Sequence, residues 1–252
     1  MNKTKFFTWI RLAVAAGIVW LFTGTFIQAQ VHTIEKSYSV EPGGTLRMNI
    51  SAGNIVIRGW EYEEVQIIAE VFGSARALDN LELRFEQDRD DVIIESRRAH
   101  RRSHRGWKRP RSERINFTIN VPYHYHIRVD VAAGEVDVDD IDGSVRVRSA
   151  AGAINVSNIF GSIDANAGAG SITVSLLDNP GPVKLNTATG GISISVPEDI
   201  NARFQLNTSV GRVRCSLENF TGSGSRLSFS YNEGGELVEA NTSVGSIRVQ
   251  SY

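Results

Sequence analysis

Short runs of alternating apolar and polar residues fill the second half of the chain, and a glycine precedes each run. The glycines that open these runs, nine residues apart at first and then at looser spacing, are Gly134, Gly143, Gly152, Gly161, Gly170, Gly181, Gly191, Gly211 and Gly245. Alternation places successive side chains on opposite faces of a β-strand. A fixed repeat of strand-forming units is typical of a β-solenoid. The pattern therefore predicts stacked short strands, with glycine supplying positive φ or close approach at the corners.

The alternation also predicts which face of each strand is buried. The predicted core set is Val136, Val138, Val145, Val147, Ile154, Val156, Ile163, Ile172 and Val174. The predicted outer set is Glu135, Asp137, Arg146, Arg148, Asn155, Ser157, Asp164 and Thr173.

Opposite charges on the outer face suggest how the strands align. A shift of nine residues would pair Asp137 with Arg146 and Asp139 with Arg148, and a shift of eighteen would bring Arg146 to Asp164. Each such cross-strand pair is worth roughly 0.2–1 kcal/mol. The sequence leaves open whether one coil holds one nine-residue unit or two.

The fold class that these patterns predict is all-β, with two halves in one continuous structure. Residues 31–131 are predicted to form more irregular, antiparallel β-structure that contains a basic insertion at 97–114. Residues 132–252 are predicted to form the repetitive solenoid, interrupted at 217–236 by a turn and an aromatic strand. The single cysteine, Cys215, alternates with Val213 and Leu217, which predicts a small core residue and excludes an intrachain disulfide.

The first 29 residues have the order of a secretory signal peptide. Lys3, Lys5 and Arg11 precede an apolar stretch at 12–27, and Ala29 offers a small residue for cleavage. The alternative is an uncleaved membrane anchor, although this stretch of sixteen residues falls short of the roughly 20 that span a bilayer. We therefore expect an exported protein in the periplasm, at the cell surface or secreted.

The opening of the mature chain resembles a known family. Gly53-Asn-Ile-Val-Ile-Arg-Gly-Trp60, followed by Glu63-Glu-Val65, is similar to the start of the bacterial DUF4097 putative-adhesin family. The later Val121-Pro122 strand and the Asn-Thr-Ser-Val-Gly segments extend the resemblance over about 38–252. The resemblance implies a right-handed, β-helix-like envelope protein without catalytic residues. The arginine-rich insertion departs from the family pattern.

That insertion is the strongest candidate for a binding site. Its nine basic residues are opposed only by Glu113, while the rest of the mature chain carries 15 basic and 27 acidic residues. Arginine suits bidentate contact with phosphate, sulfate or carboxylate groups, and a tryptophan stacks on sugars. The alternative is a solvated loop that folds back on the acidic body. The candidate anion-binding residues are Arg97, Arg98, Arg101, Arg102, Arg105, Trp107, Lys108, Arg109, Arg111 and Arg114.

A cluster of acidic residues at 135–142 suggests two more specific functions, catalysis and calcium binding. Its members are Glu135, Asp137, Asp139, Asp140 and Asp142. Paired carboxylates serve polysaccharide lyases and hydrolases, and oxygen ligands bind calcium. Outward alternation and neighbouring arginines favour a charged surface ladder instead. Asn-x-Ser/Thr triplets such as 207–209 and 241–243 are interpreted as residues at the coil corners.

Taken together, these patterns predict an exported, non-enzymatic envelope solenoid with a structural or adhesive role. The alternatives are a β-helical carbohydrate-active enzyme and a regulatory envelope module that binds a protein partner. Anionic envelope polymers, lipid head groups or a protein are the expected partners, and export disfavours nucleic acid. No cofactor and no metal are expected.

Overall fold

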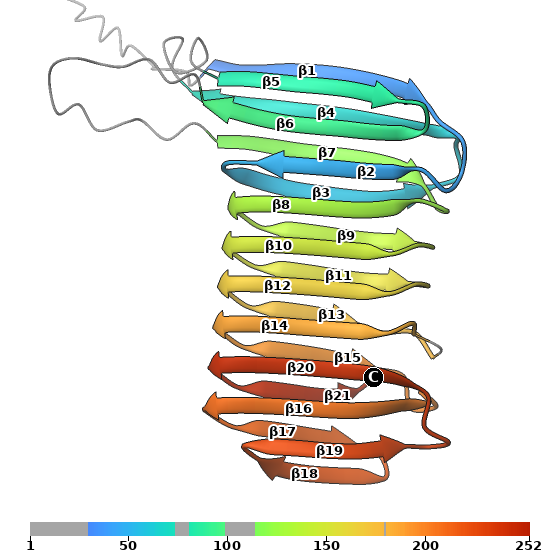
Figure 1. The fold of residues 1–252 in the computed structure, drawn as a ribbon, viewed down its shortest axis with the longest axis vertical. Coiled ribbons are helices and arrows are strands. Elements are labelled where there is room, and N and C mark those ends of the chain that lie inside the picture. The colour runs from blue at the N-terminus through green and yellow to red at the C-terminus, as the bar shows by residue number, and fades with distance from the viewer. Residues whose placement is uncertain (1–29, 74–80, 99–113, 179) are drawn as a thin grey trace, which may run out of the picture.

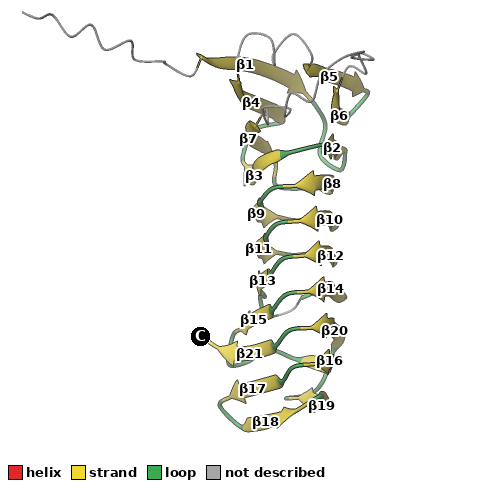
Figure 2. Cartoon of the chain, turned by 90° about the vertical axis from the view of Figure 1, so that its left-hand side faces the viewer, coloured by secondary structure: helices red, strands yellow, loops and turns green. Residues whose placement is uncertain are grey.

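The fold consists of two β-sheets that face each other along a tall stack (Figures 1 and 2). The computed structural model describes residues 30–73, 81–98, 114–178 and 180–252, and every regular element in them is a β-strand. Within these ranges no helix has the length and apolar character needed to cross a bilayer. The all-β solenoid prediction is confirmed.

Within the described residues, the strands of the two sheets, sheet A and sheet B, follow one another in space in this order. Sheet A runs β1 (Gln30–Ser39), β4 (Glu64–Gly73), β7 (Arg114–Pro122), β3 (Gly53–Trp60), β9 (Val136–Ile141), β11 (Ile154–Ile159), β13 (Ile172–Ser175), β15 (Ile192–Val196), β21 (Ile247–Ser251), β17 (Val213–Leu217) and β18 (Phe220–Gly224). Sheet B runs β19 (Arg226–Tyr231), β16 (Ala202–Val210), β20 (Glu236–Val244), β14 (Val183–Thr189), β12 (Ile163–Ala169), β10 (Val145–Ala151), β8 (His126–Ala133), β2 (Thr45–Ile50), β6 (Asp91–Arg98) and β5 (Leu81–Asp88).

One coil contributes one strand to each sheet, so it holds two nine-residue units. Val136 of β9 lies opposite Ile154 of β11 in parallel register, and β10 and β12 pair with the same shift of eighteen. The predicted pairing at a shift of eighteen is confirmed, since Arg146 Nε lies 2.9 Å from Asp164 Oδ2. The predicted pairs at a shift of nine are wrong, because units nine residues apart belong to opposite sheets.

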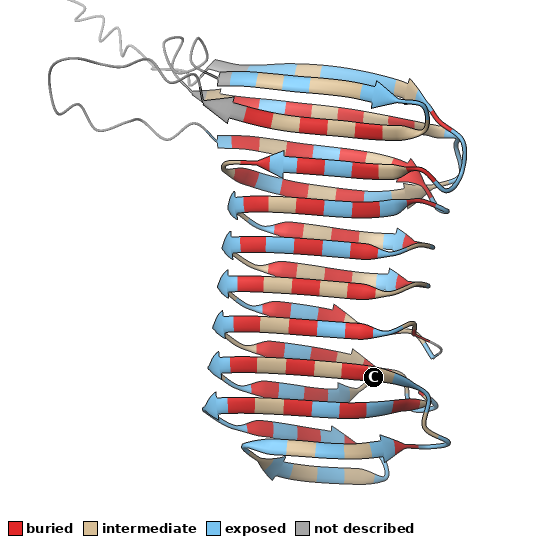
Figure 3. Ribbon diagram, viewed as in Figure 1, coloured by how far each residue is buried: buried red, intermediate tan, exposed pale blue. Residues whose placement is uncertain are grey.

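The core fills the space between the sheets, as the alternation predicts. Every residue of the predicted core set is at most 2% exposed, and every residue of the predicted outer set is half-buried or exposed. Figure 3 shows this alternation along the coils. Cys215 is buried as predicted, and burial raises the pKa of its thiol to about 12. The folded protein favours the neutral thiol. Its contribution to stability is therefore complete below pH 9.0, the ordinary pKa of a cysteine thiol, and declines as the pH rises from 9.0 towards 12.

Glycine is required at the two corners of a coil for different reasons. Gly152 has a φ of +135°, and a Cβ added there would lie 1.9 Å from the carbonyl oxygen of Gly134 in the coil before. Gly161, at the other corner, lacks such a φ, but a Cβ there would lie 2.2 Å from the carbonyl oxygen of Gly143. Both roles predicted for the corner glycines are therefore realised at these positions. The prediction is wrong for Gly191, because the neighbouring Gly190 takes the positive φ of +149° and the close approach at that corner.

The N-terminal half combines antiparallel and parallel pairing. Strands β1, β4 and β7 pair antiparallel, as do β5 and β6, which matches the predicted irregular half. Strands β2 and β3 instead pair in parallel with β8 and β9, so they extend the coil stack. They do so because their own alternation and Gly53, at a φ of +155°, reproduce the features of the later repeat. The division of the chain at residue 131 stays a prediction.

The last coil of the chain is not the last coil of the stack. Strand β20 lies between β14 and β16, and β21 lies between β15 and β17, so the C-terminus is found within the stack (Figure 1). The end is closed by β18 and β19, which form at the interruption predicted at 217–236. The ring of Phe229 stacks on Phe204 and Phe220 there, with centroids 5.0 and 4.0 Å apart.

Candidate functional site

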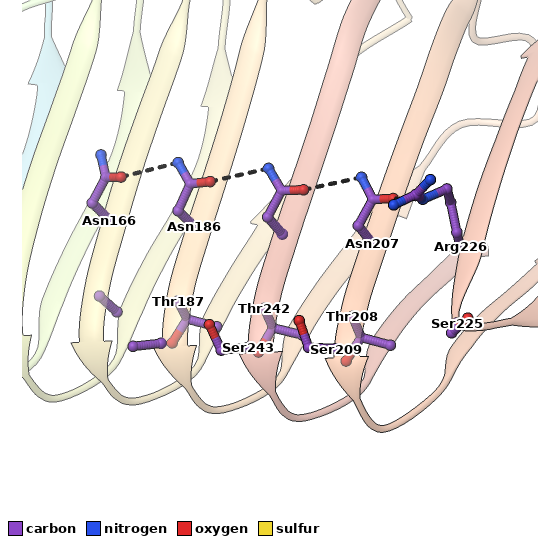
Figure 4. A pocket seen from close by; sticks show the side chains of 13 residues that line it. Asn166, Asn186, Thr187, Asn207, Thr208, Ser209, Ser225, Arg226, Thr242 and Ser243 are labelled. Atoms are coloured by element: carbon purple, nitrogen blue, oxygen red, sulfur yellow. Dashed lines mark hydrogen bonds between the residues drawn. The ribbon is translucent and has the colours of Figure 1, made fainter.

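Four asparagines stand side by side on the outer face of sheet B, and Figure 4 labels three of them, Asn166, Asn186 and Asn207. They come from adjacent strands, because the parallel register aligns Asn166 of β12 with Asn186 of β14, then with Asn241 of β20 and Asn207 of β16. Each side chain alternates with buried neighbours and so points outward, half-buried. We call this row the asparagine ladder.

Hydrogen bonds run along the asparagine ladder in a single direction. Each side-chain amide donates from Nδ2 to the Oδ1 of the next, from Asn207 to Asn241 at 3.1 Å, onward to Asn186 at 3.1 Å, and from there to Asn166 at 3.0 Å. Because bonds in such a chain polarise one another, this arrangement strengthens each of them.

Charged groups at the two ends fix that direction. Arg226 Nε donates to Asn207 Oδ1 at 2.8 Å, and Asn166 Nδ2 donates to Asp164 Oδ1 at 2.6 Å. A guanidinium group only donates and an ionised carboxylate only accepts. All four amides must therefore face the same way, with their oxygens towards Arg226.

A row of threonines beneath the ladder stabilises the corners. Thr187, Thr242 and Thr208 are 4–7% exposed. Their Oγ1 atoms donate to the carbonyl oxygens of corner glycines at 3.1, 3.1 and 2.9 Å. These hydroxyl protons are already used within the protein. The threonines therefore support the fold, and the amides above them are the groups that face solvent.

The asparagine ladder forms one wall of a groove of about 640 Å³. Small exposed residues, Ala188, Ser243 and Ser209, line it beyond the threonines. A second hollow of about 530 Å³ shares Asn166 and Ala167 with the first and continues along Arg148, Asp130 and Asn49. We call the two hollows together the ladder groove. Because it crosses the strands, it runs along the axis of the stack.

Along the asparagine ladder the groove offers neutral hydrogen-bonding groups, while its charged lining residues are Arg226 at one end and Arg148 and Asp130 in the second hollow. The amides of Asn186 and Asn207 each spend one N–H and one carbonyl lone pair on the ladder, which leaves one donor and one acceptor per amide. Asn241 spends its second N–H on Glu239 Oε1 at 2.8 Å. Among the described residues, no group of three or more His, Cys, Asp or Glu side chains is placed to hold a metal ion.

Only three of the predicted anion-binding residues, Arg97, Arg98 and Arg114, lie among the described residues. The backbone of Arg97 and Arg98 completes β6, opposite Glu82 and Leu81 of β5. Arg114 begins β7 and is exposed. The other members, Arg101, Arg102, Arg105, Trp107, Lys108, Arg109 and Arg111, lie outside the described residues. The anion-binding site therefore stays a prediction.

The acidic residues Asp137 and Asp139 bond to neutral side chains, and not to arginines as predicted. Asp137 accepts a hydrogen bond from Asn155 Nδ2 at 2.7 Å, and Asp139 accepts one from Ser157 Oγ at 2.7 Å. The partners are therefore neutral residues one coil away in sheet A, and not the arginines of sheet B. Asp142 Oδ2 lies 2.7 Å from His124 Nδ1.

The sequence held a signal for the asparagine ladder that the search for motifs missed. In four segments an asparagine precedes a corner glycine by four residues, at 166 and 170, 186 and 190, 207 and 211, and 241 and 245. The sequence pattern instead places the triplets at 207–209 and 241–243 at the coil corners. In the structure each asparagine lies within a strand, and the corner comes four residues later.

Comparison with known proteins finds one matching family and similar solved structures. The sequence model of the Toastrack DUF4097 family matches residues 124–250, just over half of the chain. No curated protein matches. The structure is similar to that of a putative cell adhesion protein from Clostridium sporogenes, with a TM-score of 0.51 and 17% identity over 88% of this chain and 100% of the other.

A putative adhesin from Bacteroides fragilis aligns with a TM-score of 0.27 and 10% identity, covering 86% of this chain and 97% of that one. The similarity to the Bacteroides fragilis structure is too low to support the fold, whereas the similarity to the Clostridium sporogenes structure supports it. The family match confirms the resemblance in the later repeats, whereas Gly53–Trp60 lies outside the matched residues. Since the match spans half of its length, the chain belongs to the Toastrack DUF4097 family.

Proposed function

We propose that this protein is an exported, non-enzymatic module of the bacterial envelope with an adhesive role. The observation that carries the proposal is the ladder groove, because it presents repeated hydrogen-bonding groups along an open surface. An enclosed pocket for one small substrate would suggest an enzyme instead. The similar Clostridium sporogenes structure belongs to a putative cell adhesion protein, and the predicted signal peptide at 1–29 supports export.

The contacts of the acidic residues argue against a carbohydrate-active enzyme. Glycosidases need a pair of carboxyl groups, one of which holds a proton. Asp139 Oδ1 accepts hydrogen bonds from Ser157 Oγ at 2.7 Å and from Asn158 Nδ2 at 3.0 Å. These bonds tie the Asp139 side chain to its neighbours on sheet A. Asp137 and Asp139 also lie on sheet A, whereas the ladder groove is on sheet B.

The arginine-rich insertion is the second part of the proposal. The insertion begins at Arg97, within the last two residues of β6 in sheet B, and ends at Arg114, the first residue of β7 in sheet A. We propose that residues 97–114 bind anionic envelope polymers or lipid head groups. A protein partner of a regulatory module is the competing ligand for the same segment.

The adhesive role is tested in cells that lack the gene and are complemented with the parent or with a loop variant. In the loop variant, Arg101, Arg102, Arg105, Lys108 and Arg109 are all changed to serine. The parent should be digested by protease added to intact cells, begin near Gln30, and restore attachment to envelope polymers. The loop variant should lose the part of attachment that weakens as salt rises, because exposed charges are screened within about 8–10 Å.

Matched amounts of both proteins at the surface are the control. An intact Met1 in the cytosolic fraction, or full attachment by cells without the gene, would contradict the proposed function. Full, equally salt-sensitive attachment by the loop variant would instead remove the insertion from the proposal.

A further inference from the structure

We infer that the ladder groove binds a linear, uncharged polysaccharide lying along the axis of the stack. This inference deepens the proposed adhesive function by naming a ligand class for one surface. It rests on the direction of the groove, on the spacing of its asparagines, and on the hydrogen-bonding groups that they leave unused.

The direction and spacing of the asparagine ladder suit an extended glycan. The asparagine ladder crosses four neighbouring parallel strands, so its amides recur at about 4.7–4.9 Å along the stack. A pyranose ring in an extended, β-linked chain advances the polymer by a similar distance. An extended peptide repeats at about 3.3–3.4 Å per residue and turns successive amides to opposite sides. A peptide would therefore fall out of step with the asparagines. The rings of an extended glycan recur at a spacing close to theirs, and because hydroxyls lie on both edges of a ring, a ring that is turned over still presents one.

The asparagine ladder leaves hydrogen-bonding groups that suit a sugar hydroxyl. Asn186 and Asn207 each keep one N–H and one carbonyl lone pair for a ligand. A sugar hydroxyl both donates and accepts. It therefore matches an amide that offers one of each, which a phosphate or an ammonium group does not.

The distribution of charge along the asparagine ladder also favours an uncharged ligand. Asp164, at one end, pairs with Arg146, and Arg226, at the other end, donates to Asn207. Between these two ends the groove is lined by amides, hydroxyls and alanines alone. A charged polymer lying over this span gives up hydration without gaining a counter-charge.

The same geometry predicts how affinity depends on length. The walls of the groove carry no aromatic platform, so each ring contributes only neutral hydrogen bonds and contact with small side chains. We expect affinity to rise about two- to tenfold for each ring added. The rise should continue until the oligosaccharide covers the four asparagines and then flatten.

The test uses the full mature chain and manno-oligosaccharides of two to six rings, with glucomannan as the polymer and polygalacturonate as its anionic counterpart. Binding is measured by calorimetry for the oligosaccharides and by gel retardation for the polymers. We expect binding of glucomannan, the stepwise length dependence, and little change as salt rises. If polygalacturonate is preferred, or if no neutral glycan binds, the inference is overturned.

Two substitutions locate the site. Ser243→Leu places a bulky side chain at an exposed position in the middle of the groove, without touching the ladder bonds. Asn241→Ala removes the central amide. Each should lower affinity at least about tenfold, the loss expected for one or two hydrogen bonds. The matched control, Ser216→Leu on the outer face of sheet A, should bind as the parent does.

Equal thermal melts of Ser243→Leu and the parent show that the fold is intact. If Ser243→Leu binds glucomannan as well as the parent does, the polymer lies elsewhere and this inference fails. Cell attachment decides the adhesive role separately, because attachment through another surface would survive Ser243→Leu.

Discussion

Replacing Gly152 with alanine should destabilise the protein by more than about 4 kcal/mol, a loss reserved for severe and specific defects. The residue has a φ of +135°, and an added Cβ would lie 1.9 Å from the carbonyl oxygen of Gly134. The clash is with backbone that is itself held in a coil, so no side chain can move aside. Denaturant unfolding of the parent and the variant measures the difference.

Two other glycines separate the clash from the backbone conformation. Gly43 has a φ of +93° but nothing within 4 Å of an added Cβ, so Gly43→Ala should cost only about 1–2 kcal/mol. Gly191 has neither feature beyond an ordinary contact at 3.4 Å, so Gly191→Ala should stay within about 0.5 kcal/mol. Equal losses in all three variants would show that the corner glycines do not touch from coil to coil.

Replacing Ile154 with aspartate should have a similarly large effect, again more than about 4 kcal/mol at neutral pH. Ile154 is fully buried and stacks between Val136 and Ile172 in the neighbouring coils. A carboxylate there would lose its hydration and find no partner. The control is Thr173→Asp on the exposed face of the next strand in sheet A, which should change stability by less than about 0.5 kcal/mol.

The pH dependence identifies the cause. Burial raises the pKa of an aspartate in the folded protein above its unfolded value of about 3.9. The folded state of Ile154→Asp should therefore be least penalised below that value and lose stability as the pH rises above it. A loss that is the same at acidic and neutral pH would indicate a packing defect rather than a buried charge.

The sequence was enough to predict the strands and their buried faces, because alternation is a local property. Each member of the predicted core set, such as Val145 and Ile163, needs no knowledge of its neighbours to be placed inward. The register was harder, because a nine-residue period is equally compatible with one unit or two in each coil. The wrong pairing of Asp137 with Arg146 followed from that ambiguity, since opposite charges occur at both shifts.

The order of the coils could not have been predicted from the repeats. The segments at 207–211 and 241–245 are identical, each reading Asn-Thr-Ser-Val-Gly, so either could stack on Asn186. The choice is made by tertiary structure. The intervening β18 and β19 close the end of the stack beside β16 and β17, which leaves β20 and β21 to fill the space before them. The asparagine ladder therefore depends on a long-range arrangement that no local pattern records.

That arrangement is the central claim, because the ladder groove exists only if Asn241 lies between Asn186 and Asn207. Paired cysteines test it directly. Neighbouring strands are about 4.7–4.9 Å apart, within the range of about 4.4–6.8 Å that a disulfide allows between Cα atoms, whereas next-nearest strands are too far apart. Native Cys215 will not interfere, since it is 2% exposed and burial raises its pKa to about 12.

The measurement is the yield of intramolecular disulfide after mild oxidation of two double variants, read by mass spectrometry. Asn186→Cys with Asn241→Cys, 55 residues apart in sequence, should cross-link almost completely. Asn186→Cys with Asn207→Cys should remain reduced. The opposite result, a disulfide between positions 186 and 207 and none between 186 and 241, would show that the coils stack in sequence order and would contradict the groove described here.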